Sequence, residues 1–295
     1  MDHSQKIEVQ ILNAFVDNNK GGNPAGVVLN ADKLTNEQKL EIAGKVGLSE
    51  TAFVSKSEIA DFKLDFFTPT RQIAHCGHAT VATFSYLSQL GLINKTTSSK
   101  ETIDGTREIL INGDLAFMEQ KPPQYSDVGN QRGKIITSLG LTEKDVLKDA
   151  SVLIVHTGNS FAIIPVENEE VLKRIVPDFN LITQVSEEFD LIGYYVFCKQ
   201  TDDPQRVANT RMFAPRYGIA EEAGTGMAAG PLACYLYDHL FVKKERILIQ
   251  QGEFMNPPSR SLIIVDLTIQ EGKITKVMAG GKGIAMKSIT VKLGE

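Results

Sequence analysis

Titratable side chains crowd one short loop ahead of an apolar segment, in the order His75, Cys76, Gly77, His78. The segment from Ala79 to Leu90 is nearly all small or apolar, and Gly91 follows it, which predicts a buried helix with a glycine at its C-terminal end. The N-terminus of a helix offers unpaired backbone N–H groups and partial positive charge. The sequence therefore predicts an end that could bind a carboxylate or phosphate beside an imidazole and a thiol.

This loop could support several kinds of chemistry. A metal cluster of His75, Cys76 and His78 is disfavoured, because three ligands within four residues do not readily converge on one ion. Cys76 could be a thiolate nucleophile, activated by the helix N-terminus and a histidine. His78 could hold a ligand, or it could simply cap and pack the first helical turn.

Glu50 is a carboxylate in apolar company, between Leu48 and the run Ala52–Val54 at the start of a predicted strand. Local sequence alone favours a side chain at the strand edge that points to solvent. If the side chain faces the interior instead, burial would disfavour its charged form and make it a usable general acid and base.

The same order of strand, loop and helix occurs a second time. Glu221 and Glu222 precede the loop residues Gly224, Thr225, Gly226 and Met227, and an apolar helix is predicted from Ala228 to Leu240. Pro69 and Pro215 are 146 residues apart, and Gly77 and Gly224 are 147 apart. A period of this length indicates duplicated domains. The two carboxylates could complement the helix dipole, or one could anchor a substrate amine or hold a proton.

Composition narrows the class of protein. The chain has 295 residues, 42% hydrophobic and 23% charged, which suffices for two globular domains. With a net charge of −5 and no basic block, neither nucleic acid nor an anionic membrane is an expected partner. No apolar run is long enough to span a membrane, and the first residues lack the apolar core of a signal peptide. Three scattered cysteines are typical of reduced thiols in the cytoplasm.

The predicted elements are mostly strands, with one long buried helix in each half. A helix from Asn36 to Val46 is predicted after the cap residue Thr35. The run Lys121–Arg132 is predicted to link two domains, and Lys276–Gly281 and Gly283–Leu293 to form a final pair of strands. We expect an α+β fold in which a mixed sheet wraps around each buried helix, not a doubly wound nucleotide-binding fold.

A series of short motifs then resembles the PhzF (phenazine biosynthesis-like) family, in order along nearly the whole chain. The motifs are Asn23–Val28, Ser49–Val54, Phe67–Pro69, Cys76–Thr80, Arg211–Pro215, Gly224–Gly226, Ala229–Leu232 and Gln251-Gly252. This family is similar to diaminopimelate epimerase and proline racemase. The resemblance implies two pseudo-symmetric domains, 1–128 with the returning segment 282–295, and 129–281, with the active site in the cleft between them.

The resemblance also implies a cofactor-independent isomerase that needs no metal and acts on a small carboxylated metabolite, in a homodimer. Glu50 matches the family's general acid/base. The implied substrate-binding residues are His78, Gly77, Cys76, Glu222, Thr225, Gly226 and Met227.

Two of these positions depart from the family, which has Asp where Glu222 stands and Ser where Met227 stands. Ala223 occupies the place of the second thiol of the two-thiol epimerases, so a two-thiol racemase is not expected. The alternative is a catalytically idle relative that binds a metabolite or serves as a scaffold.

Overall fold

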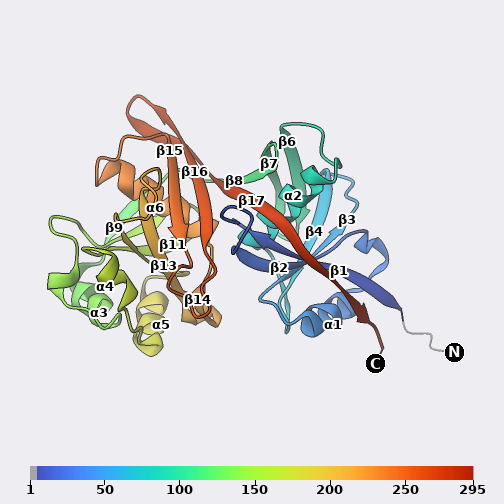
Figure 1. The fold of residues 1–295 in the computed structure, drawn as a ribbon, viewed down its shortest axis with the longest axis horizontal. Helices are drawn as coiled ribbons and strands as arrows, with labels where there is room; N and C mark the ends of the chain where they lie inside the picture. Colours follow the sequence, from blue (N-terminus) through green and yellow to red (C-terminus); the bar gives the residue numbers. More distant parts are fainter. Residues whose placement is uncertain (1–4, 295) are drawn as a thin grey trace. The chain divides into compact units, whose positions relative to one another are not determined.

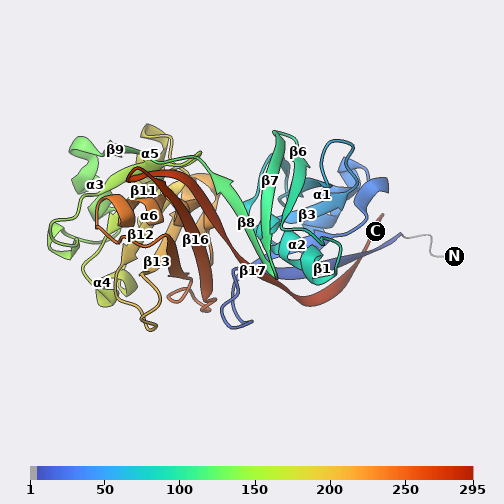
Figure 2. The ribbon, with the colours of Figure 1, turned by 90° about the horizontal axis from the view of Figure 1, so that it is seen from above.

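A computed structural model describes residues 5–294. Residues 1–4 and 295, at the outer ends of the predicted N-terminal domain, lie outside this range. The chain divides into two compact units, one up to Met118 together with the segment from Gly280 onward, the other from Glu119 to Ala279. The strands β8 and β17 each continue without a break from one unit into the other, so no loop marks either boundary (Figure 2). The predicted boundaries after residues 128 and 281 stay predictions.

In its described residues, the first unit has two α-helices, a short 3-10 helix at Ala31–Lys33, and more residues in strands than in helices. Its elements are β1 (Lys6–Ala14), β2 (Asn23–Val28), α1 (Asn36–Val46), β3 (Thr51–Ser55), β4 (Phe62–Phe67), β5 (Gln72–Ile73), α2 (Gly77–Gln89), β6 (Thr97–Thr102), β7 (Gly105–Asn112) and β8 (Leu115–Gln120).

The second unit has more helices, including short 3-10 turns at Gly129–Gln131, Glu143–Asp145 and Pro215–Tyr217. Its elements are β9 (Gln124–Asp127), α3 (Arg132–Thr137), β10 (Leu153–His156), β11 (Ser160–Pro165), α4 (Glu169–Lys173), α5 (Phe179–Glu188), β12 (Gly193–Cys198), β13 (Ala208–Ala214), β14 (Ile219–Glu222), α6 (Gly226–Asp238), β15 (Arg246–Gln251), β16 (Ser261–Gln270) and β17 (Lys273–Lys292).

Both units follow one scheme of strand pairing. In the first, β1–β2 is antiparallel, β2–β3 parallel, β3–β4 and β4–β5 antiparallel, β4–β6 parallel and β6–β7 antiparallel. In the second, β10–β11 is antiparallel, β11–β12 parallel, β12–β13 and β13–β14 antiparallel, β13–β15 parallel and β15–β16 antiparallel. The identical order confirms the mixed sheets and the internal repeat predicted from the motif spacing.

Each unit also places one 13-residue helix against its strands (Figure 1). The helix α2 contacts β1, β2, β3 and β7, and α6 contacts β10, β11 and β16. Ten of the 13 residues of each helix are buried, as the apolar composition predicted. No helix in the described part of the chain is both long enough and apolar enough to cross a bilayer.

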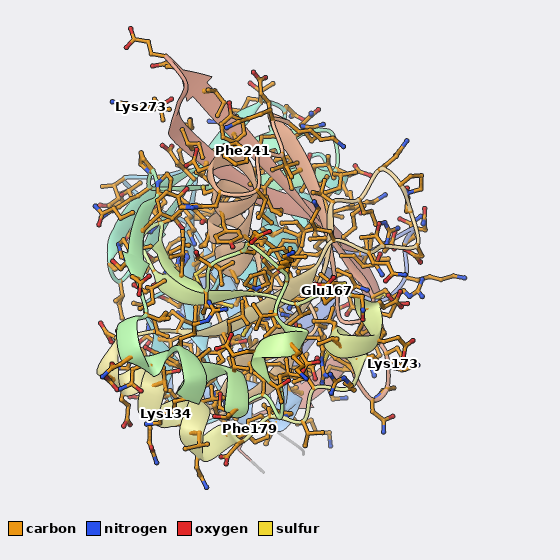
Figure 3. All side chains as sticks on the ribbon, turned by 90° about the vertical axis from the view of Figure 1, so that its left-hand side faces the viewer. Lys134, Glu167, Lys173, Phe179, Phe241 and Lys273 are labelled. Atoms are coloured by element: carbon orange, nitrogen blue, oxygen red, sulfur yellow. The ribbon has the colours of Figure 1, made fainter. Side chains whose placement is uncertain are left out.

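The remaining helices cover other faces of the sheets. In the first unit, α1 packs its Ile42 and Ala43 into an apolar cluster with residues of β1, β2 and β3. In the second, α3, α4 and α5 share a larger cluster with β12. Figure 3 shows Lys134 of α3 and Phe179 of α5 on the outer surface of this unit.

Several predicted elements need correction. The supposed link Lys121–Arg132 contains β9, which pairs with β10 along four residues and so belongs to the sheet of the second unit. The segment Glu143–Asp145 is a single 3-10 turn. The expected final pair of strands is the single 20-residue strand β17, which pairs with β1 from Gly283 to Lys292.

Candidate functional site

The apolar end of β2 positions Glu50 at the start of β3. The Gly26 N–H donates to the Glu50 carbonyl at 3.0 Å, and Gly26 lies opposite Thr51 in the parallel ladder. A Cβ on Gly26 would lie only 2.7 Å from Thr51 Oγ1, so glycine lets the two strands approach this closely. The segment from Asn23 belongs to β2, and its Gly26 serves strand packing.

Glu50 faces His78, which corrects the expectation of a side chain at the solvent edge. The side chain of Glu50 is 13% exposed, and its Oε2 lies 3.4 Å from His78 Nε2. On the other side of the imidazole, His78 Nδ1 lies 3.6 Å from Cys76 Sγ. A carboxylate, an imidazole and a thiol thus form a continuous chain of contacts, along which a proton can be held or passed.

The N-terminus of α2 sets this geometry. The helix begins at Gly77, two residues earlier than predicted, with Cys76 as its N-cap residue. The Thr80 hydroxyl donates to the Cys76 carbonyl at 2.6 Å and fixes the first turn. Burial raises the pKa of the Cys76 thiol, while the neighbouring His78 opposes that shift. The buried Cys76 and His78 are therefore held by the helix itself.

His75 does not join the other loop residues. Its Nδ1 lies 3.1 Å from Nζ of the fully buried Lys100, which also donates to Thr80 Oγ1 at 2.8 Å. Burial, with the nearby charge of Lys100, lowers the pKa of His75 to about 3. Burial likewise lowers the pKa of Lys100 to about 7. The buried amine of Lys100 thus supports the loop through His75 and Thr80. Lys100 was not singled out from the sequence.

In the second unit, the two adjacent carboxylates point to different partners. Glu221 accepts two hydrogen bonds of 2.8 Å from Arg211, whose guanidinium also donates to the carbonyls of Leu172, in α4, and Ile175, just after it. Glu222 accepts a short hydrogen bond from the Thr225 hydroxyl. Glu221 therefore anchors β13 and β14, and Glu222 lies at the N-terminus of α6.

Gln251 holds the loop before α6. Its motif, Gln251-Gly252, belongs to the family resemblance, which implied no role for it. Gln251 donates to the Glu222 carbonyl at 2.7 Å and to Thr225 Oγ1 at 3.1 Å. Its Oε1 accepts from the Thr225 N–H at 3.1 Å and from the Tyr195 hydroxyl at 2.8 Å. One of the backbone donors at this helix N-terminus is therefore engaged by the protein.

Met227 lies in the first turn of α6, after Gly226. Its Sδ accepts a hydrogen bond from Asn159 Nδ2 at 3.4 Å, and Asn159 comes from the turn between β10 and β11. Within the second unit the structure thus brings together Glu222, Thr225, Gly226 and Met227, and within the first it brings together Glu50, Cys76, Gly77 and His78.

The chain matches the family described as phenazine biosynthesis-like protein (PhzC-PhzF) over residues 12–288. It is 30% identical over 297 residues to an uncharacterized isomerase of Clostridium acetobutylicum, covering 96% of this chain and 97% of that protein. It is 27% identical over 291 residues to the trans-2,3-dihydro-3-hydroxyanthranilate isomerase of Pseudomonas chlororaphis, covering 96% and 98%.

Solved structures agree. The phenazine biosynthesis protein of the PhzF family from Bacillus anthracis is similar with a TM-score of 0.87 and 30% identity, covering 97% of this chain and 99% of that one. A hydroxyproline epimerase from Agrobacterium vitis, at 14% identity and a TM-score of 0.60 over 100% and 95% of the chains, shares the fold. The epimerase-like α+β fold is thereby confirmed. The chain belongs to the phenazine biosynthesis-like (PhzF) family, and it is an isomerase.

Proposed function

We propose that the protein is a cofactor-independent isomerase that moves a proton between two carbons of a small carboxylated metabolite, with Glu50 as general acid and base. The observation that carries this proposal is the 3.4 Å contact between Glu50 Oε2 and His78 Nε2 in a nearly buried setting. A carboxylate held by a neighbouring imidazole keeps one orientation toward a bound substrate.

The reaction needs one group with two successive roles. Glu50 takes a proton from one carbon as that C–H bond breaks, and the electron pair shifts the double bond. The new O–H bond of Glu50 then breaks and returns the proton to a second carbon on the same face. This sequence balances without a redox cofactor, and it needs no second thiol, in keeping with Ala223 at the corresponding position.

Substrate binding is proposed for both helix N-termini. The Gly77–His78 end of α2 offers backbone donors to a carboxylate, beside Cys76. Glu222, Thr225, Gly226 and Met227 are proposed to bind the other side of the substrate, in the cleft between the halves that the family resemblance implies.

We infer that the substrate differs from that of the hydroxyanthranilate isomerase among the relatives. Glu222 has a longer side chain than the family's Asp. Met227 replaces a hydroxyl by a thioether that already accepts a hydrogen bond from Asn159. These two changes favour a substrate with an apolar group where the family's serine would bind a polar one.

Solvent-deuterium incorporation into small amino and hydroxy carboxylic acids tests the function. Wild type should exchange at least one carbon-bound proton of a substrate in such a panel. The exchange rate of Glu50→Gln should be about 10²–10⁴-fold lower than that of wild type. Glu58→Gln, an exposed glutamate in the loop after β3, is the matched control and should keep the wild-type rate.

Three outcomes would redirect the proposal. Turnover by Glu50→Gln at the wild-type rate would remove Glu50 from the chemistry, and loss of turnover only in Cys76→Ala would assign it to the thiol. Tight binding of a panel member with no exchange would support the alternative, an idle metabolite-binding relative. A homodimer and a cytoplasmic location remain part of the proposal, and light scattering and cell fractionation test them.

A further inference from the structure

Three different metal-ligating groups meet in the first unit. The carboxylate of Glu50, the thiol of Cys76 and the imidazole of His78 each offer one donor atom, and these atoms all lie within 4.8 Å of one another. They come from two segments, the start of β3 and the N-terminus of α2. The motif His75-Cys76-Gly77-His78 alone does not show this set, because Glu50 is remote in sequence.

Each of the two contacts to His78 has the length of one ligand pair in a zinc site. With Zn–S near 2.3 Å and Zn–N near 2.0–2.1 Å, a tetrahedral site separates sulfur and nitrogen ligands by about 3.5 Å. Cys76 Sγ and His78 Nδ1 are 3.6 Å apart, and Glu50 Oε2 and His78 Nε2 are 3.4 Å apart. Those two contacts use opposite nitrogens of one ring, so binding requires Cys76 or Glu50 to turn toward the nitrogen that ligates.

His75 is excluded from the set by its own contacts. Its ring lies against Lys100 Nζ, and Lys100 is in turn bonded to Thr80. A buried amine next to an imidazole repels a cation. His75 therefore cannot join Cys76 and His78 as a third ligand. Glu50 can, because it comes from a different segment, directly before β3.

We propose that Glu50, Cys76 and His78 bind a soft or borderline divalent cation of the Zn²⁺ or Cd²⁺ class. Sulfur, nitrogen and one carboxylate oxygen suit such ions, whereas Mg²⁺ and Ca²⁺ require oxygen ligands. Three protein ligands leave one position for water or a substrate group. Glu50, with 13% of its side chain exposed, is the ligand nearest to solvent.

Binding has a chemical consequence for the thiol and a functional one for Glu50. The Cys76 S–H bond breaks as the S–metal bond forms, and the proton passes to the buffer. If the proposed function holds, a Glu50 that ligates a metal cannot accept a substrate proton, so the cation inhibits the isomerase. This second step rests on the proposed function, whereas metal binding itself does not.

Titration of the metal-free protein with Cd²⁺, followed by the ultraviolet thiolate-to-cadmium absorption band, tests the site without a substrate. In the wild-type protein, the absorption band should saturate at one equivalent of Cd²⁺. The band should disappear in Cys76→Ala, and affinity should fall at least about tenfold in Glu50→Gln and in His78→Gln. Mg²⁺ in excess should not compete, and Zn²⁺ should.

The chain supplies matched controls. Cys198→Ala and Cys234→Ala remove the two other buried thiols, and His75→Gln removes the neighbouring imidazole. All three should keep wild-type affinity, provided that circular dichroism shows each variant folded.

A band that survives Cys76→Ala, or the absence of any band in wild type, would overturn the site. Loss of affinity in His75→Gln with wild-type affinity in Glu50→Gln would assign binding to the loop alone and contradict the role of Glu50. A normal cadmium band, together with proton exchange that Zn²⁺ does not inhibit, would instead contradict the role of Glu50 in isomerisation.

Discussion

The side chain of Gln251 bonds Thr225 twice, accepting from its backbone N–H and donating to its hydroxyl, each at 3.1 Å. Gln251 ends β15, and Thr225 is the N-cap residue of α6. The same amide also donates to the Glu222 carbonyl at 2.7 Å. One buried glutamine thus fixes the positions of Glu222 and Thr225, two of the residues proposed to bind substrate in the second unit.

Gln251→Leu should therefore lower the free energy of unfolding by about 1–3 kcal/mol, because it leaves the buried Thr225 N–H and the Tyr195 hydroxyl without their acceptor. Urea denaturation measures this loss. Tyr195→Phe is the control, since it removes one donor to Gln251 and leaves both bonds to Thr225, and it should cost less. Unchanged stability of Gln251→Leu, with an unchanged amide shift of Thr225, would contradict the role given to Gln251.

A contact between Ser85 and Gly283 fastens α2 to β17 in the first unit. The Gly283 N–H donates to Ser85 Oγ at 2.8 Å, and the Ser85 hydroxyl lies 3.0 Å from the Gly283 carbonyl and 2.5 Å from the Asp114 carbonyl. A Cβ on Gly283 would lie 2.7 Å from Ala82 Cα, so the strand passes directly over the helix. This contact holds the helix that carries Cys76 and His78.

Ser85→Ala should lower the free energy of unfolding by about 1–3 kcal/mol, because the buried Gly283 N–H then has no acceptor. Ser88→Ala is the matched control, also on α2, where the hydroxyl makes an exposed hydrogen bond of 2.9 Å to the Gly113 carbonyl. Its effect should stay within about 0.5 kcal/mol. Equal losses in thermal or urea unfolding of the two variants would contradict the importance of the α2–β17 contact.

Much of the fold could be predicted from the sequence because the spacing of apolar residues indicates the helices and strands. The cap residue Thr35 and the span Asn36–Val46 of α1 were predicted to the residue, and the structure adds a capping box with Gln38. The two buried helices and most central strands were found for the same reason. The repeat was visible because the loop motifs preceding α2 and α6 have a common spacing.

The strand β6 could not be found this way. Its sequence, Thr-Ser-Ser-Lys-Glu-Thr from Thr97 to Thr102, contains no apolar residue, yet Ser98, Lys100 and Thr102 alternate as buried positions. Each is buried with a polar partner, among them Asp61 for Ser98 and Thr80 for Lys100. A hydrophobic pattern does not show a strand whose buried face is hydrogen-bonded, so Lys100 was missed with it.

Other differences have local causes. Glycines at 280, 281 and 283 predict a break, but β17 continues through them because they allow close approach to neighbouring backbone, as at Ala116 and Ala82. The helix α5 was missed although a signal exists, since Asp178 after Pro177 caps it by accepting from the N–H groups of Asn180 and Leu181. The inward orientation of Glu50 depends on His78, a tertiary contact that local sequence does not encode.

Lys100 makes the free energy of unfolding depend on pH. Its pKa, about 7 in the folded state against 10.5 normally, is lowered first of all by burial. Between these values the unfolded chain keeps the proton that the folded chain has lost, so the unfolded state binds more protons and rising pH favours folding. Below pH 7 both states carry the proton, and the folded state bears the full cost of a buried charge.

The wild-type free energy of unfolding should therefore rise relative to that of Lys100→Met as pH increases from 7 to 9, by at most about 1.4 kcal/mol per pH unit. Staying below pH 9 limits the contribution of the Cys76 thiol, whose ordinary pKa is 9.0 and which burial raises. His75, with a pKa lowered to about 3, stays neutral throughout this range.

Urea denaturation at several pH values gives the two curves. Lys95→Met, which removes an ammonium on a side chain that is 60% exposed, is the control for loss of a lysine as such. Parallel curves for wild type and Lys100→Met would mean that Lys100 holds its proton equally in the folded and unfolded states, and that the amine beneath the Cys76 loop is charged at neutral pH.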